Sequence, residues 1–225
     1  MIPVKDGIAT RETPVVNYVL IAINVIVYLF MALAAPETQA AIIARYAMTP
    51  AHFADGVTVA DMMTIFTSMF MHAGLAHLGG NMLYLWIFGD NVEDRIGHFR
   101  YLMFYLVGGV VASLAHLVIN WGSGLPTVGA SGAIAAVLGA YLLLFPASRI
   151  VTYIPLGHFS RLTTAPAFVF LGLWFILQLF EGVMSFGGAD VGGVAFWAHV
   201  GGFVAGMVMI KRLPTGERRG RALTW

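Results

Sequence analysis

Long apolar segments are the feature that most limits how this chain can fold. Of its 225 residues, 59% are hydrophobic and only 10% are charged, whereas soluble domains carry about 25% charged residues. Six apolar segments can be marked, at Val15–Ala35, His77–Phe88, Tyr101–Ile119, Ala133–Phe145, Ala167–Phe180 and Ala195–Ile210. Backbone N–H and C=O groups in lipid need hydrogen-bond partners within their own segment. The six segments therefore predict an all-α integral membrane protein with six transmembrane helices.

The basic residues predict how these helices are oriented. With a cytoplasmic amino terminus, eleven of the twelve Lys and Arg residues fall in cytoplasmic segments and only Arg45 falls outside, as the positive-inside rule requires. We predict a cytoplasmic tail over 1–14, a six-span domain over 15–210 and a basic cytoplasmic tail over 211–225. The first segment lacks a signal-peptide cleavage pattern, so it is expected to be retained. The expected location is a bacterial inner (plasma) membrane.

Three polar clusters, at residues 72–81, 129–132 and 198–202, interrupt the apolar segments. The inner ends of their segments are predicted at Asp90, Pro146 and Lys211. Helix rise then places His77, Ser131 and His199 about 20, 22 and 18 Å above the inner boundary. Polar groups are costly in lipid, so a set of them at one depth around a buried cavity predicts a functional site.

The fourth segment is too short to cross the bilayer from Ser131. The Gly- and Pro-rich stretch 120–128 before it is therefore predicted to be a re-entrant loop, which lines protein or a wet cavity. Ser131 falls at the predicted helix start, where free N–H groups favour a developing anion. A packing or capping serine is the alternative.

Small residues and paired polar side chains suggest how the segments meet. Small-xxx-small patterns, which allow close helix approach, occur at Gly132, Ala136 and Ala140 and at Gly202 and Gly206. If these two segments pair, Ser131 and His199 come within hydrogen-bond reach. His77 and Asn81 project from one helix face, either as donors to an oxyanion or as a structural polar pair.

The sequence lacks the residues that other functions and catalytic mechanisms require. A net charge of +1 argues against a nucleic-acid partner, and the absence of Cys excludes a thiolate nucleophile. A zinc protease would show His-Glu-x-x-His, but no Glu lies between His72 and His77. Asp90 and Asp190 fall at opposite ends of spans, and the two lysines lie near the chain ends. Serine with histidine is the chemistry that remains.

Three motifs then resemble those of the rhomboid intramembrane serine proteases. They are Thr67-x-x-Phe70-x-His72-x-x-x-x-His77-x-x-x-Asn81, Gly129-x-Ser131-Gly132 and Ala198-His199-x-x-Gly202-x-x-x-Gly206. The similarity runs from the first segment through the sixth. It implies a Ser131–His199 catalytic dyad without a third acid, cleavage of other proteins' transmembrane segments, and no metal or organic cofactor. It also implies an oxyanion site made by His77, Asn81 and the Ser131 N–H.

Structural support is expected from His72, Gly129, Gly132, Gly202 and Gly206. Two departures from the family stand out: Met63-Thr64 replaces a Trp-Arg pair, and Ala135 replaces an aromatic residue that stacks on the histidine. The predicted function is an intramembrane serine endopeptidase, and the alternative is a non-catalytic binder of membrane proteins. Two elements are candidates for the gate that admits the substrate, the fifth segment and the loop Ser185–Gly193. Gln178 and Glu181 are either gate residues or interfacial residues.

Overall fold

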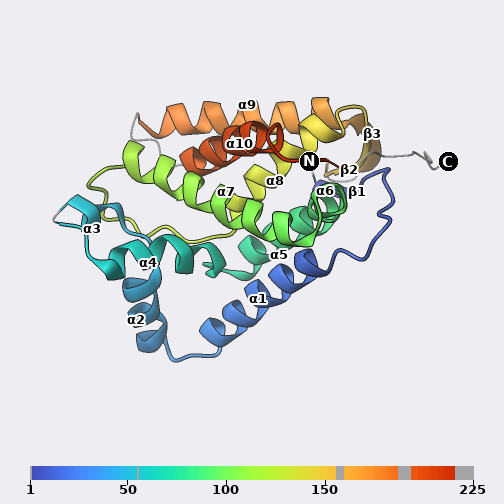
Figure 1. Ribbon diagram of the computed structural model, residues 1–225. Helices are drawn as coiled ribbons and strands as arrows, with labels where there is room; N and C mark the ends of the chain where they lie inside the picture. Colours follow the sequence, from blue (N-terminus) through green and yellow to red (C-terminus); the bar gives the residue numbers. More distant parts are fainter. Residues whose placement is uncertain (1, 55, 156–159, 187–193, 216–225) are drawn as a thin grey trace.

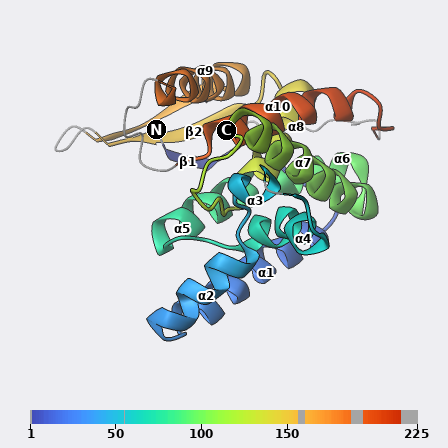
Figure 2. The ribbon, with the colours of Figure 1, turned by 90° about the vertical axis from the view of Figure 1, so that its left-hand side faces the viewer.

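Helices account for most of the chain in the computed structural model, which describes residues 2–54, 56–155, 160–186 and 194–215. Most of the Ser185–Gly193 loop and of the 211–225 tail lies outside the described residues. The α-helices are α1 (Val15–Ala32), α2 (Pro36–Tyr46), α3 (Pro50–Ala54), α4 (Val59–Thr67), α5 (Leu75–Tyr84), α6 (Asp90–Ile96), α7 (His98–Ile119), α8 (Ser131–Leu144), α9 (Ala167–Ser185) and α10 (Phe196–Ile210). Helices α9 and α10 lie on one side of the molecule and α1 and α2 on the other, with α7, α8 and α5 between them (Figures 1 and 2).

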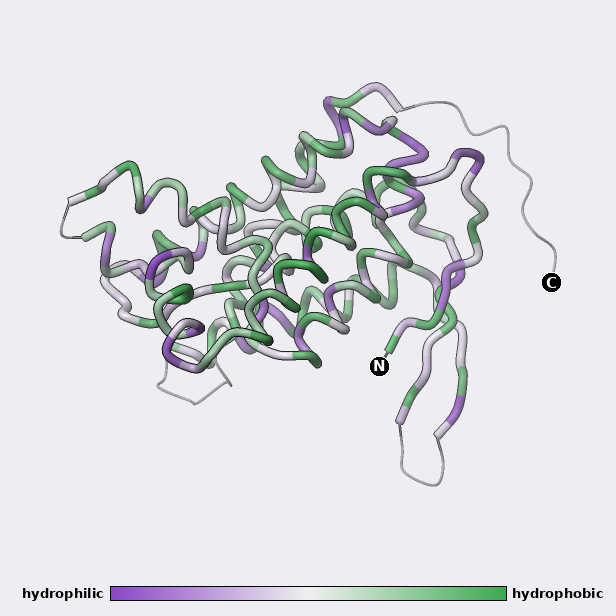
Figure 3. The backbone as a smooth tube through the Cα atoms, turned by 90° about the horizontal axis from the view of Figure 1, so that it is seen from below, coloured by the Kyte–Doolittle hydropathy of each residue, from purple (hydrophilic) through white to green (hydrophobic). Residues whose placement is uncertain are grey.

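Three helices, α1, α7 and α9, are each long and apolar enough to cross a membrane. A fourth candidate is the pair Val59–Phe70 and Leu75–Ile96, which is bent by 78°. Helices α8 and α10 are apolar but shorter. Hydrophilic segments gather toward the ends of the molecule (Figure 3), and large apolar side chains such as Phe30 and Phe180 are exposed. The chain is therefore a helical membrane protein, and each predicted apolar segment contains a helix.

The second segment is longer than the sequence predicted. The predicted segment ends at Phe88, but the helical path continues from α5 through one π-helical stretch, η2 (Leu85–Gly89), into α6. Gly89 makes this path possible, because a Cβ there would overlap the Asn17 side chain and the Tyr101 hydroxyl. Asp90 therefore lies within the helical path, and its place at the inner membrane boundary stays a prediction.

A small sheet departs from the all-α expectation. Strands β1 (Ile2–Lys5), β2 (Arg149–Ile154) and β3 (Arg161–Pro166) pair antiparallel in the order β1-β2-β3. Thus part of the predicted amino-terminal tail is bound to the segment between α8 and α9. The sheet and the last residues of α10 lie at the same end of the molecule (Figure 1).

Buried polar groups at this same end fix α1 to the rest of the bundle. The Glu93 carboxylate is 1% exposed and accepts the N–H groups of Val16 (2.9 Å) and Asn17 (2.7 Å). These are free N–H groups of the first turn of α1, so the negative charge also meets the positive end of the helix dipole. Asn17 in turn accepts from the Tyr101 hydroxyl at 2.8 Å, which connects α1 and α7.

Helix α8 forms the centre of the core, since every residue from Gly132 to Tyr141 is buried. Helix α10 packs against it with the two backbones in direct contact. A Cβ on Gly202 would overlap the Gly132 carbonyl oxygen, and one on Gly206 would overlap that of Ala136. The two small-residue faces, whose spacing allows close helix approach, therefore pack against each other.

Gly206→Ala is expected to destabilise the protein strongly, because the added methyl would displace a backbone rather than a side chain. Overpacking of this kind costs about 1–3 kcal/mol or more. Gly172→Ala on α9 is the control, because its Cβ meets nothing within 4 Å. Thermal unfolding in detergent should show a lowered midpoint for Gly206→Ala only. Equal midpoints for the two variants would contradict the close backbone packing.

Candidate active site

Ser131 and His199 meet at the beginnings of the two central helices. Ser131 is the first residue of α8, and His199 lies in the first turn of α10. The Ser131 Oγ lies 2.8 Å from His199 Nε2, a distance at which the hydroxyl donates to a neutral imidazole. Both helix starts are held by the contact between Gly132, one residue after Ser131, and Gly202, three residues after His199. The structure thus brings together the two residues that the sequence paired.

His77 and Asn81 approach this pair from α5. They line a cavity of about 280 Å³ together with Ser131 and His199. The Asn81 Nδ2 lies 2.9 Å from His72 Nε2, and the rings of His72 and His77 meet edge to face with centroids 5.1 Å apart. His72, which the resemblance made a support for the first loop, therefore contacts both polar side chains of α5.

Gly129 closes the site on the side of the loop. It has φ +135°, and a Cβ there would lie 2.8 Å from His77 Nε2. Its N–H donates to the Ser68 carbonyl oxygen at 2.9 Å. Residue 129 therefore has to be a glycine, because a side chain there would collide with His77 and the positive φ disfavours other residues.

The loop before α8 is tied to the segment that follows α2. Met48 and Thr127 exchange backbone hydrogen bonds of 2.8 and 3.2 Å, and the Ala51 N–H donates to the Ser123 carbonyl oxygen at 2.9 Å. His116 Nε2 lies 3.1 Å from the Thr127 Oγ1. His116 therefore holds this loop.

Two contacts of His199 were not predicted, and both come from α9. Its Nδ1 lies 2.5 Å from the Gln178 Oε1. The Trp174 ring lies over the imidazole with centroids 5.9 Å apart and an interplanar angle of 34°. The sequence signal was present, because Trp174 and Gln178 are four residues apart and share one helix face. From the sequence alone, the position of Gln178 predicts a gate or interfacial residue.

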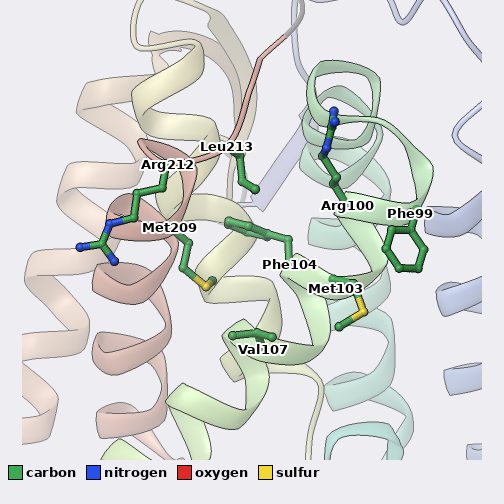
Figure 4. Close-up of a pocket in the computed structure, with 8 residues that line it drawn as sticks. All are labelled: Phe99, Arg100, Met103, Phe104, Val107, Met209, Arg212 and Leu213. Carbon is green, nitrogen blue, oxygen red and sulfur yellow. The ribbon is translucent and has the colours of Figure 1, made fainter.

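A second cavity of about 340 Å³ lies between α7 and α10 and has a different character. Phe104, Val107 and Met209 line it, and the guanidinium groups of Arg100 and Arg212 point away from one another (Figure 4). It contains no serine, histidine or carboxylate. Among the residues described, no group of three or more His, Cys, Asp or Glu is placed to hold a metal ion.

Fold and site together define a helical membrane protein with a partly buried Ser–His pair beside a cavity that His77 and Asn81 also line. The Rhomboid domain model matches residues 59–214, which include both members of the pair. Because the match covers more than half of the chain, the chain belongs to the rhomboid family.

Similar proteins come from bacteria and mitochondria. The chain is 32% identical to the Rhomboid protease GluP of Bacillus subtilis over 137 residues, covering 60% of this chain and 26% of that protein. It is 28% identical to the mitochondrial presenilin-associated rhomboid-like protein of Bos taurus, covering 77% and 45%. It is 34% identical to the mitochondrial Rhomboid protein 1 of Saccharomyces cerevisiae, covering 43% and 29%. The chain thus spans less than half the length of these relatives.

Gly129→Ala is expected to destabilise the protein and move the His77 ring. The strained backbone costs about 1–3 kcal/mol, and the methyl would also press on His77. Gly122→Ala is the control, because Gly122 has φ +78° but open space around its Cβ. Thermal unfolding together with NMR of the labelled histidine rings checks this. A His77 signal that responds to both variants, or to neither, would contradict the assigned contact.

Proposed function

We propose that this protein is an intramembrane serine endopeptidase that cleaves transmembrane segments of other proteins. The observation that carries the proposal is the 2.8 Å contact between Ser131 Oγ and His199 Nε2, beside a cavity that His77 and Asn81 also line. A serine is a weak nucleophile until a neighbouring base accepts its proton. Membership of the rhomboid family and similarity to a relative named as a protease support the same function.

The geometry supports a two-stage acyl transfer. His199 Nε2 takes the Ser131 proton while Oγ attacks the scissile carbonyl carbon, and a tetrahedral oxyanion forms. The imidazolium then gives its proton to the leaving nitrogen, the C–N bond breaks, and an acyl ester remains on Ser131. Water, activated by the same His199 Nε2, hydrolyses that ester. The cavity of about 280 Å³ has room for several water molecules.

Three donors are assigned to the oxyanion. The Ser131 N–H belongs to the first turn of α8, where it has no partner within the helix and adds the positive end of the dipole. An amide nitrogen carries two hydrogens, so Asn81 can donate one to His72 and the other to the oxyanion. His77 is the third donor, beside Gly129.

We further propose six membrane crossings, with both termini on the cytoplasmic face and the 120–128 loop re-entrant from outside. Helix α8 is about 21 Å long, short of the roughly 30 Å hydrocarbon core, so its first residue lies within the membrane if its other end reaches the inner boundary. The proposed host is a bacterial inner membrane, as the Bacillus subtilis relative suggests. The mitochondrial relatives make a mitochondrial membrane the alternative.

Ser131→Ala and His199→Ala are each expected to abolish cleavage of a model single-pass substrate, because the nucleophile or its base is lost. Ser185→Ala, which removes another helix hydroxyl, is the control and should cleave normally. Purified protein in liposomes and mass spectrometry of both fragments give the measurement. Cleavage at near wild-type rate by either folded site variant would rule out the dyad. A wild-type protein that cleaves nothing would instead favour the purely binding role.

Asn81→Ala is expected to lower kcat by about 10- to 1,000-fold and to change KM much less, since the oxyanion contact forms in the transition state. Asn24→Ala is the control: Asn24 is also fully buried, on α1, and donates to the Leu20 carbonyl oxygen at 2.8 Å. This control should lose stability but keep kcat. A raised KM with unchanged kcat in Asn81→Ala would instead assign Asn81 to substrate binding.

A further inference from the structure

The base of the pair is held from α9 rather than from α8. Position 135, one turn after Ser131, is a fully buried alanine, so α8 offers His199 no ring to stack on. On the other side, α9 presents Trp174 and Gln178 to the same imidazole. Phe196 adds an edge-to-face contact from α10 itself, with centroids 6.3 Å apart.

The two contacts from α9 restrict different movements of the ring. The Trp174 ring, tilted by 34° with centroids 5.9 Å apart, packs beside the imidazole and limits movement of the ring on that side. The Gln178 Oε1 lies 2.5 Å from Nδ1, on the opposite side of the ring from the Nε2 that meets Ser131. A carbonyl oxygen can only accept a hydrogen bond, so this contact requires the proton on Nδ1.

We propose that Gln178 is the positioning residue of His199, fixing the imidazole in the tautomer whose Nε2 is free to accept the Ser131 proton. The inference rests on the proposed hydrolase function of the same site. A carboxylate or an amide that accepts from Nδ1 performs this task in soluble Ser–His–Asp and Cys–His–Asn enzymes. In lipid an amide has the further advantage of orienting the ring without adding a buried charge.

A positioning role for Gln178 predicts different mutational effects from a gate or an interfacial role. Glu181 lies one turn further along α9 and is also half-buried, so a gate or interface effect should extend to it. A positioning effect should be confined to Gln178. Helix α9 has few buried residues, namely Ala167, Phe170, Leu171 and Gly182. The orientation of the base therefore depends on a peripheral helix.

The experiment compares Gln178→Leu, Gln178→Glu and Glu181→Leu with the wild-type 225-residue chain in liposomes. Leucine removes the acceptor at similar size, and Gln178→Leu should lose about 10- to 100-fold in kcat with KM within about threefold. Gln178→Glu keeps an acceptor and should restore most of that loss. Glu181→Leu should cleave at the wild-type rate.

A second readout does not require catalysis. NMR of ¹⁵N-histidine-labelled protein in detergent, with the His199 signal assigned by its loss in His199→Ala, should show the proton on Nδ1 in the wild type and a redistribution in Gln178→Leu. A Gln178→Leu variant with wild-type kcat or an unchanged tautomer would overturn the proposal, as would equal losses in Gln178→Leu and Glu181→Leu. If the wild-type protein cleaves nothing, but the proton on His199 Nδ1 is redistributed in Gln178→Leu, only the hydrolase function is refuted.

Discussion

Direct backbone contact between α8 and α10 is the constraint on which the site depends. Gly202 rests against the Gly132 carbonyl, and Gly206 against that of Ala136. Without a hydrophobic driving force in lipid, helices associate through such close packing. Because Ser131 and His199 stand at the starts of these two helices, the distance between Oγ and Nε2 follows from how closely the backbones approach.

The remaining parts of the site are added around this pair. Helix α5 brings Asn81 and His77, and His72 and Gly129 hold these side chains in place. Each group is polar and lies among apolar helices, where an unpaired donor or acceptor is costly. The hydrogen bonds of these side chains therefore have two effects: they satisfy buried polar groups, and they orient those groups toward the cavity.

Much of this arrangement could be predicted, because it depends on local signals. Glycine spacing predicted the α8–α10 contact, and the position of Ser131 after a Gly-rich stretch predicted a helix start. The sheet could not be found in this way, since β1 pairs with a strand nearly 150 residues away. The charge of Asp90 predicts the end of a span, but it does not show that the helical path itself continues to Ile96. Gln178 near a helix end has the same pattern as an interfacial residue, and only the tertiary contact with His199 distinguishes it.

Covalent labelling tests the central claim, that Ser131 is a nucleophile activated by His199, without any knowledge of the substrate. A fluorophosphonate reacts with an activated serine and leaves its phosphonyl group on Oγ. Peptide mass spectrometry of the treated protein should find one adduct, on Ser131, and none in His199→Ala. An absent adduct, an adduct on another serine, or labelling of Ser131 that persists in His199→Ala would contradict the account.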